Sequence, residues 1–210
     1  MNAGRLVLCA ALASIGAGLF FLCRGVLMDS RATALSEQLR RLLPPSVGQW
    51  SDGIAYGAVH TAPADFPPDD EGDRLISWAL FCAAVMNREQ GEEGGPFRPW
   101  GEWSGEGDSG HAVTPWQLDK RYHGKFLNAH PRDELRDSEY ACGLLADNWK
   151  HFRQYGGELA QAATAASYNA SRAKVIAALE SDPTISAADA LTTGGNYGSD
   201  VLRRFGGFVS

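Results

Sequence analysis

Glu89 is the residue whose position most clearly suggests chemistry, because it follows a long apolar run. Residues 75–86 (LISWALFCAAVM) carry no charge, and a run of this length that is apolar on every face is typical of a fully buried helix. Such a helix delivers the Glu89 carboxylate to the edge of the core, where burial raises the pKa of a glutamate and suits it to donate a proton near neutral pH. The pattern predicts a general acid, although taken alone it also fits a glutamate that merely ends a helix.

Two more carboxylates lie in residues 105–123 (GEGDSGHAVTPWQLDKRYH). Asp108 and Asp119 are eleven residues apart, with Gln117 between them. The basic cluster that follows, residues 120–125, is typical of a solvated face and could also contact an anionic polymer.

The elements that must position these residues are mostly helical. Apolar residues at helical spacing predict a helix over 31–43, which Pro44 and Pro45 end. Residues 46–73, rich in Gly, Pro and Asp, are expected to be linker or irregular packing, and residues 90–116 a long loop with room for a short hairpin. Further helices are predicted over 134–154, 158–169, 171–180, 186–193 and 196–205.

Residues 6–23 (LVLCAALASIGAGLFFLC) form an uncharged apolar run. Its eighteen residues lie at the threshold for a membrane-spanning helix and exceed the apolar region of about 7–15 residues in a signal peptide. We therefore expect an uncleaved membrane anchor, with a cleaved signal peptide and a buried soluble helix as alternatives. Either of the first two places the remaining chain on the exported side, periplasmic or extracellular.

Composition excludes some classes of function. The chain has 210 residues, enough to bury a core, and a net charge of −6, which argues against nucleic acid as a partner. There is no CxxC pair, and the five histidines lack a ligand spacing such as HExxH, so we predict no metal and no cofactor. Cys82 is expected to be a buried apolar cysteine, which in an exported domain could pair with Cys142.

Four motifs, in order over residues 74–208, resemble those of the goose-type lysozymes and, more loosely, of the soluble lytic transglycosylases that share their fold. Residues 87–90 (NREQ) match the S-R-E-[ST] helix end that carries the catalytic glutamate. Residues 107–119 match a G-W-G-D…G-L-M-Q-V-D segment, residues 167–171 (SYNAS) an A-Y-N-A-G motif, and residues 197–204 (YGSDVLRR) a terminal Y-A-N-D-V-V-A-R helix. The Gly/Ala-rich centre of residues 6–23 also resembles the membrane segment of some phage endolysins.

The resemblance implies a mainly α, lysozyme-like fold with a small irregular or β-hairpin segment. With the N-terminal run, it divides the chain into a membrane anchor (1–28), an amphipathic helix and linker (29–73) and a catalytic domain (74–210). It further implies a muramidase that hydrolyses the β-1,4 bond between N-acetylmuramic acid and N-acetylglucosamine in peptidoglycan. Glu89 would be the general acid, and Asp119 and Asp108 would position the attacking water, as in inverting glycosidases.

The resemblance also implies a set of substrate-binding residues: Gln117, Tyr168, Asn169, Tyr197 and Trp116. Tyr197 is expected to pack near Glu89, or simply to be core, and Asn169 could instead cap a helix. Trp116 belongs to a Thr-Pro-Trp stretch that replaces Gly-Leu-Met of the family, and Ser171 replaces a glycine. Trp116 therefore either fills space or stacks on a sugar.

Two other functions remain open at this point. A lytic transglycosylase of the same fold lacks the aspartate pair, uses the substrate's own hydroxyl as nucleophile and leaves 1,6-anhydro ends. A wall-binding scaffold would keep the fold without turnover, and an exposed, well-solvated Glu89 would be its signature.

Overall fold

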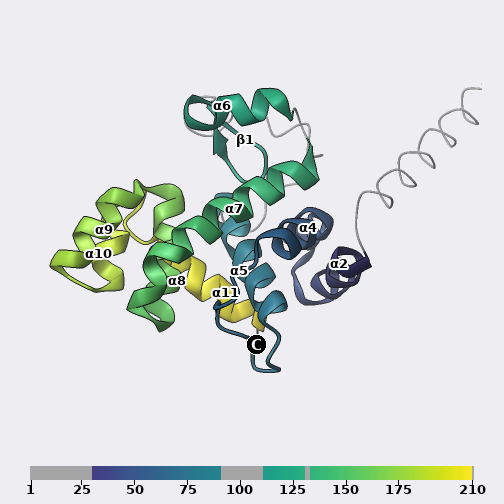
Figure 1. Ribbon diagram of the computed structural model, residues 1–210, viewed down its shortest axis with the longest axis horizontal. Coiled ribbons are helices and arrows are strands. Elements are labelled where there is room, and N and C mark those ends of the chain that lie inside the picture. The colour runs from purple at the N-terminus through teal and green to yellow at the C-terminus, as the bar shows by residue number, and fades with distance from the viewer. Residues whose placement is uncertain (1–29, 91–110, 131–132, 210) are drawn as a thin grey trace, which may run out of the picture.

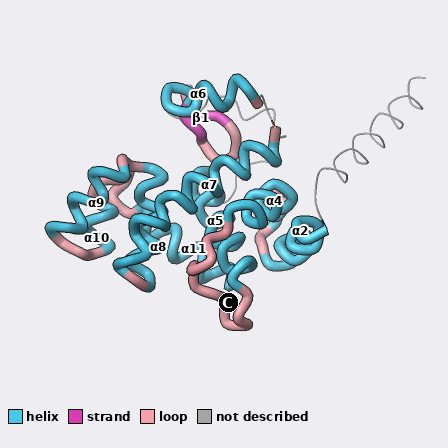
Figure 2. Tube along the Cα trace, viewed as in Figure 1, coloured by secondary structure: helices cyan, strands magenta, loops and turns pink. Residues whose placement is uncertain are grey.

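The computed structural model describes residues 30–90, 111–130 and 133–209, which form a mainly helical molecule with one small hairpin (Figures 1 and 2). This confirms the predicted fold class at the level of mainly α. The elements are α2 (Ser30–Leu42), α3 (Pro45–Gly48), α4 (Ser51–Thr61), α5 (Arg74–Glu89), β1 (Ala112–Val113), β2 (Leu118–Asp119), α6 (Lys120–Ala129), α7 (Glu134–Phe152), a 3-10 turn (Arg153–Tyr155), α8 (Gly157–Asn169), α9 (Arg172–Ser181), α10 (Ile185–Asp189) and α11 (Tyr197–Val209).

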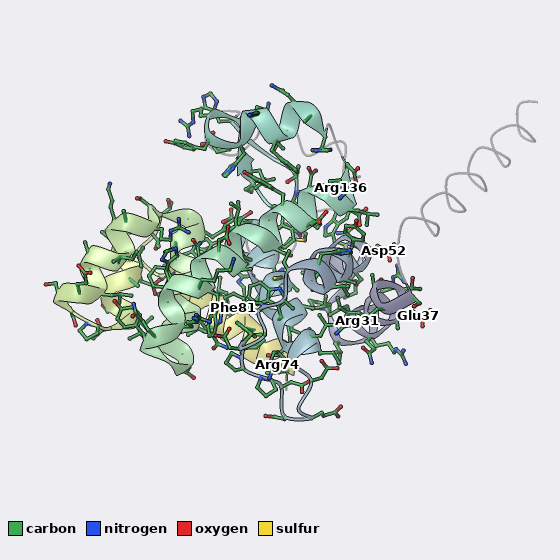
Figure 3. The ribbon with its side chains drawn as sticks, viewed as in Figure 1. Arg31, Glu37, Asp52, Arg74, Phe81 and Arg136 are labelled. Carbon is green, nitrogen blue, oxygen red and sulfur yellow. The ribbon has the colours of Figure 1, made fainter. Side chains whose placement is uncertain are left out.

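Helix α5 lies at the centre of the molecule and is buried on all sides, as its composition predicts. Every residue from 77 to 87 is buried. Asp73 begins the helix, because its side chain accepts hydrogen bonds from the backbone N–H groups of Leu75 and Ile76. Phe81 lies in the middle of the fold (Figure 3), and its ring meets that of Phe205 in α11 edge-on at 5.9 Å. Glu89, the last residue of α5, is half-buried where the helix leaves the core.

Helix α4 replaces the linker that the sequence suggested for residues 46–73. Its glycines make close contact with α7: a Cβ on Gly57 would lie 2.7 Å from the carbonyl oxygen of Ser138 and 2.8 Å from Sγ of Cys142. Glycine therefore serves helix packing here, and the prediction of linker or irregular packing was wrong over residues 46–48 and 51–61. At the other face of α4, Asp52 (Figure 3) accepts a hydrogen bond from Ser36 of α2 at 2.7 Å. Residues 62–73 do form an irregular connection.

The hairpin and α6 lie together beyond one end of α7, at the top of Figure 1. Strands β1 and β2 are antiparallel, with Ala112 opposite Asp119. The connection between them contains two residues in the left-handed region, Thr114 (φ 64°) and Gln117 (φ 50°). Helix α6 was not predicted: the basic cluster forms its first turns, and none of its residues is buried, in agreement with a solvated face.

The last helix, α11, packs against both α5 and α8. Its first turn is fixed by Asp189 of α10, whose carboxylate accepts hydrogen bonds from the backbone N–H groups of Gly198 and Ser199. A Cβ on Gly198 would lie 2.6 Å from the carbonyl oxygen of Ala162 in α8, so only glycine permits this approach. The contact brings Tyr197 against the end of α5.

Two further expectations concern the apolar N-terminal run and the cysteines. The apolar run 6–23 lies outside the described residues, and among the helices that are described none has the length and apolarity needed to cross a bilayer. Cys82 is buried as predicted, and Cys142 is buried beside it; both thiols are free.

Candidate active site

A cleft of about 510 Å³ opens at the end of α5 and brings together segments far apart in the sequence. Five of the predicted site residues line it: Glu89, Gln117, Asp119, Tyr168 and Asn169. The other lining residues come from the hairpin, α6, α7 and the connection before α11: Ala112, Leu118, Tyr122, His123, Leu144 and Thr193. The candidate catalytic carboxyl group therefore shares one cavity with most of the predicted substrate-binding side chains.

Tyr197, the first residue of α11, forms a hydrogen bond with Glu89. The Tyr197 side chain is 2% exposed, and its hydroxyl donates a hydrogen bond to Oε1 of Glu89. Burial raises the pKa of Glu89 to about 7, although the Tyr197 hydrogen bond and the positive charge of Arg88 act to lower it. A substantial fraction of Glu89 is thus protonated at neutral pH, as a general acid requires.

Arg88, the residue before Glu89, forms an ion pair with Asp200 of α11. Nε of Arg88 lies 3.2 Å from Oδ2 of Asp200, and the guanidinium group lies 5.6 Å from the centre of the Tyr197 ring. Asp200 also accepts hydrogen bonds from Arg203 and Arg204; burial acts to raise its pKa, but these bonds keep the pKa below its ordinary value. Pairing with Asp200 reduces the effect of Arg88 on Glu89. Sequence reasoning assigned no role to Arg88 or Asp200, although both lie within the matched motifs.

We expect the raised pKa of Glu89 to reduce the stability of the fold at high pH. The folded-state pKa of about 7 lies above the ordinary value of 4.5, so the contribution of Glu89 is fully present below pH 4.5 and is lost as the pH rises through 7. Glu89→Gln mimics the protonated form. It should therefore raise the free energy of unfolding at pH 8 by on the order of 3 kcal/mol and change it little at pH 4.

Urea unfolding of both proteins at the two pH values measures this difference. Glu158→Gln, which removes an exposed carboxylate from the first turn of α8, is the matched control and should show no such pH dependence. Parallel pH profiles for the wild type and Glu89→Gln would mean that Glu89 has an ordinary pKa in the folded protein.

Asp119 lines the cleft but also has a structural role. Its carboxylate caps α6 by accepting a hydrogen bond from the backbone N–H of Arg121, at 2.7 Å, and pairs with the guanidinium group of the same residue. The hydrogen bond from the Arg121 side chain lowers the pKa of Asp119 to about 2, so Asp119 is ionised throughout the physiological range. Such a carboxylate is a weak base, better suited to orient a water than to remove its proton.

Trp116 and Tyr168 hold the hairpin in place. The Trp116 side chain is fully buried, and its Nε1–H donates to Oγ of Ser138 in α7 at 3.0 Å. The Tyr168 hydroxyl donates to the carbonyl oxygen of Trp116 at 2.9 Å, while Tyr168 also lines the cleft. The amide of Gln117 donates to the carbonyl oxygen of Thr114. The structure therefore places Trp116 as a packing residue, and it identifies Ser138 as a partner that the sequence did not suggest.

Asn169 connects the cleft to the segment before α11. Its Oδ1 accepts a hydrogen bond from the backbone N–H of Thr193 at 2.8 Å, and both residues line the cleft. The N-cap position of α9 belongs to Ser171, so Asn169 does not cap that helix.

The remaining predictions for the site fall outside what the structure places. Asp108 lies outside the described residues, so its position relative to Glu89 stays a prediction. Among the residues that are described, no three His, Cys, Asp or Glu side chains gather as a metal site would require.

Comparison with known proteins gives no relative of this chain. The chain matches no protein-family model, no curated protein and no solved structure.

Proposed function

We propose that the protein is a muramidase, which hydrolyses the β-1,4 bond between N-acetylmuramic acid and N-acetylglucosamine in peptidoglycan. The observation that carries this proposal is the position of Glu89, a half-buried carboxyl group with a pKa of about 7 that faces a cleft. Gln117, Tyr168 and Asn169, which belong to motifs that resemble those of goose-type lysozymes, line the same cleft. We further propose that residues 6–23 hold the enzyme at the membrane, with the catalytic domain on the exported side.

In this reaction Glu89 protonates the glycosidic oxygen as the bond to the anomeric carbon breaks. The carboxylate that remains is stabilised by the hydrogen bond from Tyr197. A water molecule attacks the anomeric carbon from the opposite face and leaves a reducing end. Asp119, ionised and on the cleft wall, orients this water together with Asp108, and Asp108 accepts its proton.

A lytic transglycosylase is the second candidate, and the environment of Asp119 favours it. The pairing of Asp119 with Arg121 and its pKa of about 2 weaken this residue as a base. A transglycosylase needs no such base for water, because the attacking hydroxyl comes from the sugar itself. It would use Glu89 in the same cleft and release 1,6-anhydro ends.

Mass spectrometry of the products distinguishes these functions. Purified peptidoglycan is digested with the full-length protein, and with Glu89→Gln as the control. Reducing ends that the control does not produce would identify a muramidase, and 1,6-anhydro ends a transglycosylase. The absence of any cleavage that depends on Glu89 would leave a wall-binding scaffold as the function.

Asp119→Asn separates the catalytic role of Asp119 from its structural role. Asparagine caps helices as well as aspartate does, so α6 should keep its first turn, and the melting temperature should fall only modestly because the partly exposed ion pair with Arg121 is lost. If Asp119 orients water, the variant should form reducing ends about 10²-fold more slowly. Initial rates of product release measure this effect. An unchanged rate, with the fold intact, would rule out water activation by Asp119.

A further inference from the structure

A second lobe of the cleft, of about 600 Å³, extends from Tyr168 and Asn169 along α7 towards the start of α9. The two lobes adjoin each other, since five residues line both: Tyr122, His123, Leu144, Tyr168 and Asn169. The residues that belong to the second lobe alone are Asp147, Asn148, Ser167, Ala170, Ser171 and Arg172. None of them belongs to the hydrogen-bond and ion-pair contacts described above for Glu89 and Arg88.

Polar groups in the wall of this lobe are only weakly satisfied by the protein. Ser167 is 8% exposed, and within the described part of the chain its hydroxyl has no hydrogen-bond partner. Asn148 is 7% exposed and has two long contacts, to the carbonyl oxygen of Thr164 at 3.4 Å and to Nη1 of Arg172 at 3.5 Å. A buried polar group without a good hydrogen-bond partner destabilises the fold unless a ligand or a water molecule forms the missing hydrogen bond. These groups therefore indicate a binding site for a polar ligand.

The charge of the lobe favours an anion. Helix α9 begins here, and its N-cap residue, Ser171, makes no side-chain hydrogen bond to the helix. The first N–H groups of a helix carry partial positive charge and bind anions when no side chain caps them. Arg172, the first residue of α9, adds a full positive charge. The lobe also contains the carboxylate of Asp147, which is paired with Lys150 at 2.7 Å.

We propose that this lobe binds a carboxylate on the lactyl-peptide arm of muramic acid, and that Arg172 is its principal contact. This assignment of the ligand rests on the proposed function. Every N-acetylmuramic acid carries a lactyl group that ends either in a carboxylate or in a peptide with carboxylates of its own. N-acetylglucosamine has no such group. A guanidinium group pairs with a carboxylate through two parallel hydrogen bonds, so the lobe would distinguish peptidoglycan from a neutral glycan beside the cleavage site.

Binding to insoluble peptidoglycan tests this proposal without requiring turnover. The full-length protein carries Glu89→Gln to prevent cleavage, and Arg172→Gln is compared with Lys174→Gln, an exposed lysine of the same helix outside both lobes. Co-sedimentation is measured with native peptidoglycan and with peptidoglycan whose carboxyl groups have been converted to amides. We expect Arg172→Gln to weaken binding to the native polymer about tenfold, the effect of one charged hydrogen-bonded contact. It should leave binding to the amidated polymer unchanged, and Lys174→Gln should affect neither.

Equal effects of Arg172→Gln on the native and amidated polymers would overturn the proposal, as would no effect on either. Soluble strands freed of peptides by an amidase carry only the lactyl carboxylate. If they compete for binding in an Arg172-dependent manner, the lactyl group is the ligand, and if they do not, the stem peptide is. Arg172-dependent binding without any Glu89-dependent cleavage would support the lobe and reject the muramidase, so the two proposals fail separately.

Discussion

Replacing Glu89 with glutamine is expected to lower kcat for peptidoglycan cleavage by about 10²–10⁴-fold, the usual contribution of a general acid. Glutamine has nearly the shape of the protonated side chain and can accept the hydrogen bond from Tyr197, but it has no proton to give to the leaving oxygen. The loss should therefore appear in kcat rather than in KM. Initial rates of muropeptide release near pH 6, where most of the wild-type Glu89 is protonated, measure the effect.

Glu158→Gln provides the control for this experiment as well. It removes one carboxylate from an exposed site and should leave kcat at the wild-type value. The melting temperature of each variant shows whether the fold is intact. A Glu89→Gln protein that is folded and cleaves at the wild-type rate would exclude Glu89 as the acid for either glycosidase reaction.

Trp116→Ala is expected to lower the free energy of unfolding by about 3–5 kcal/mol, the range for removing a large aromatic side chain from a core. Trp116 is fully buried and donates a hydrogen bond to Ser138, so the substitution leaves both a cavity and an unpaired hydroxyl. The hairpin that carries Gln117 and Asp119 should lose its fixed position, and activity should fall with stability. Urea denaturation measures the first effect, and product release the second.

Trp116→Phe distinguishes packing from hydrogen bonding at this position. Phenylalanine fills most of the space but cannot donate to Ser138, so we expect a smaller loss of about 1–2 kcal/mol. If Trp116→Ala retained the wild-type stability and lost only affinity for the glycan, the ring would act in the cleft rather than in the core.

The sequence is most informative where local pattern and burial agree. The apolar run before Glu89 predicts both a buried helix and a raised pKa, and the structure has both. The proximity of Tyr197 to Glu89 could not be derived from pattern, since the two residues are 108 positions apart; it was predicted only through the resemblance to a family. Periodicity cannot supply a contact of this range.

Other features were missed because they depend on contacts between elements that are distant in the sequence. Gly53 and Gly57 resemble linker residues, yet in α4 they permit contact with α7 that a larger side chain would block. The pairing of Arg88 with Asp200 and the anchoring of Trp116 by Ser138 join elements whose packing no local pattern specifies. The residue types show that such side chains can form hydrogen bonds or ion pairs, but they do not show which residues they pair with.

The hydrogen bond between Tyr197 and Glu89 can form only late in the synthesis of the chain. Tyr197 emerges from the ribosome after Glu89 by the 108 residues that separate them, which at about 5–20 residues per second corresponds to roughly 5–20 s. During this interval α11 is not available to cover the end of α5. The hydrogen bond from Tyr197, and the part of the burial of Glu89 that α11 supplies, can form only after this interval. The nascent chain therefore passes through a period in which Glu89 lacks its hydrogen bond from Tyr197.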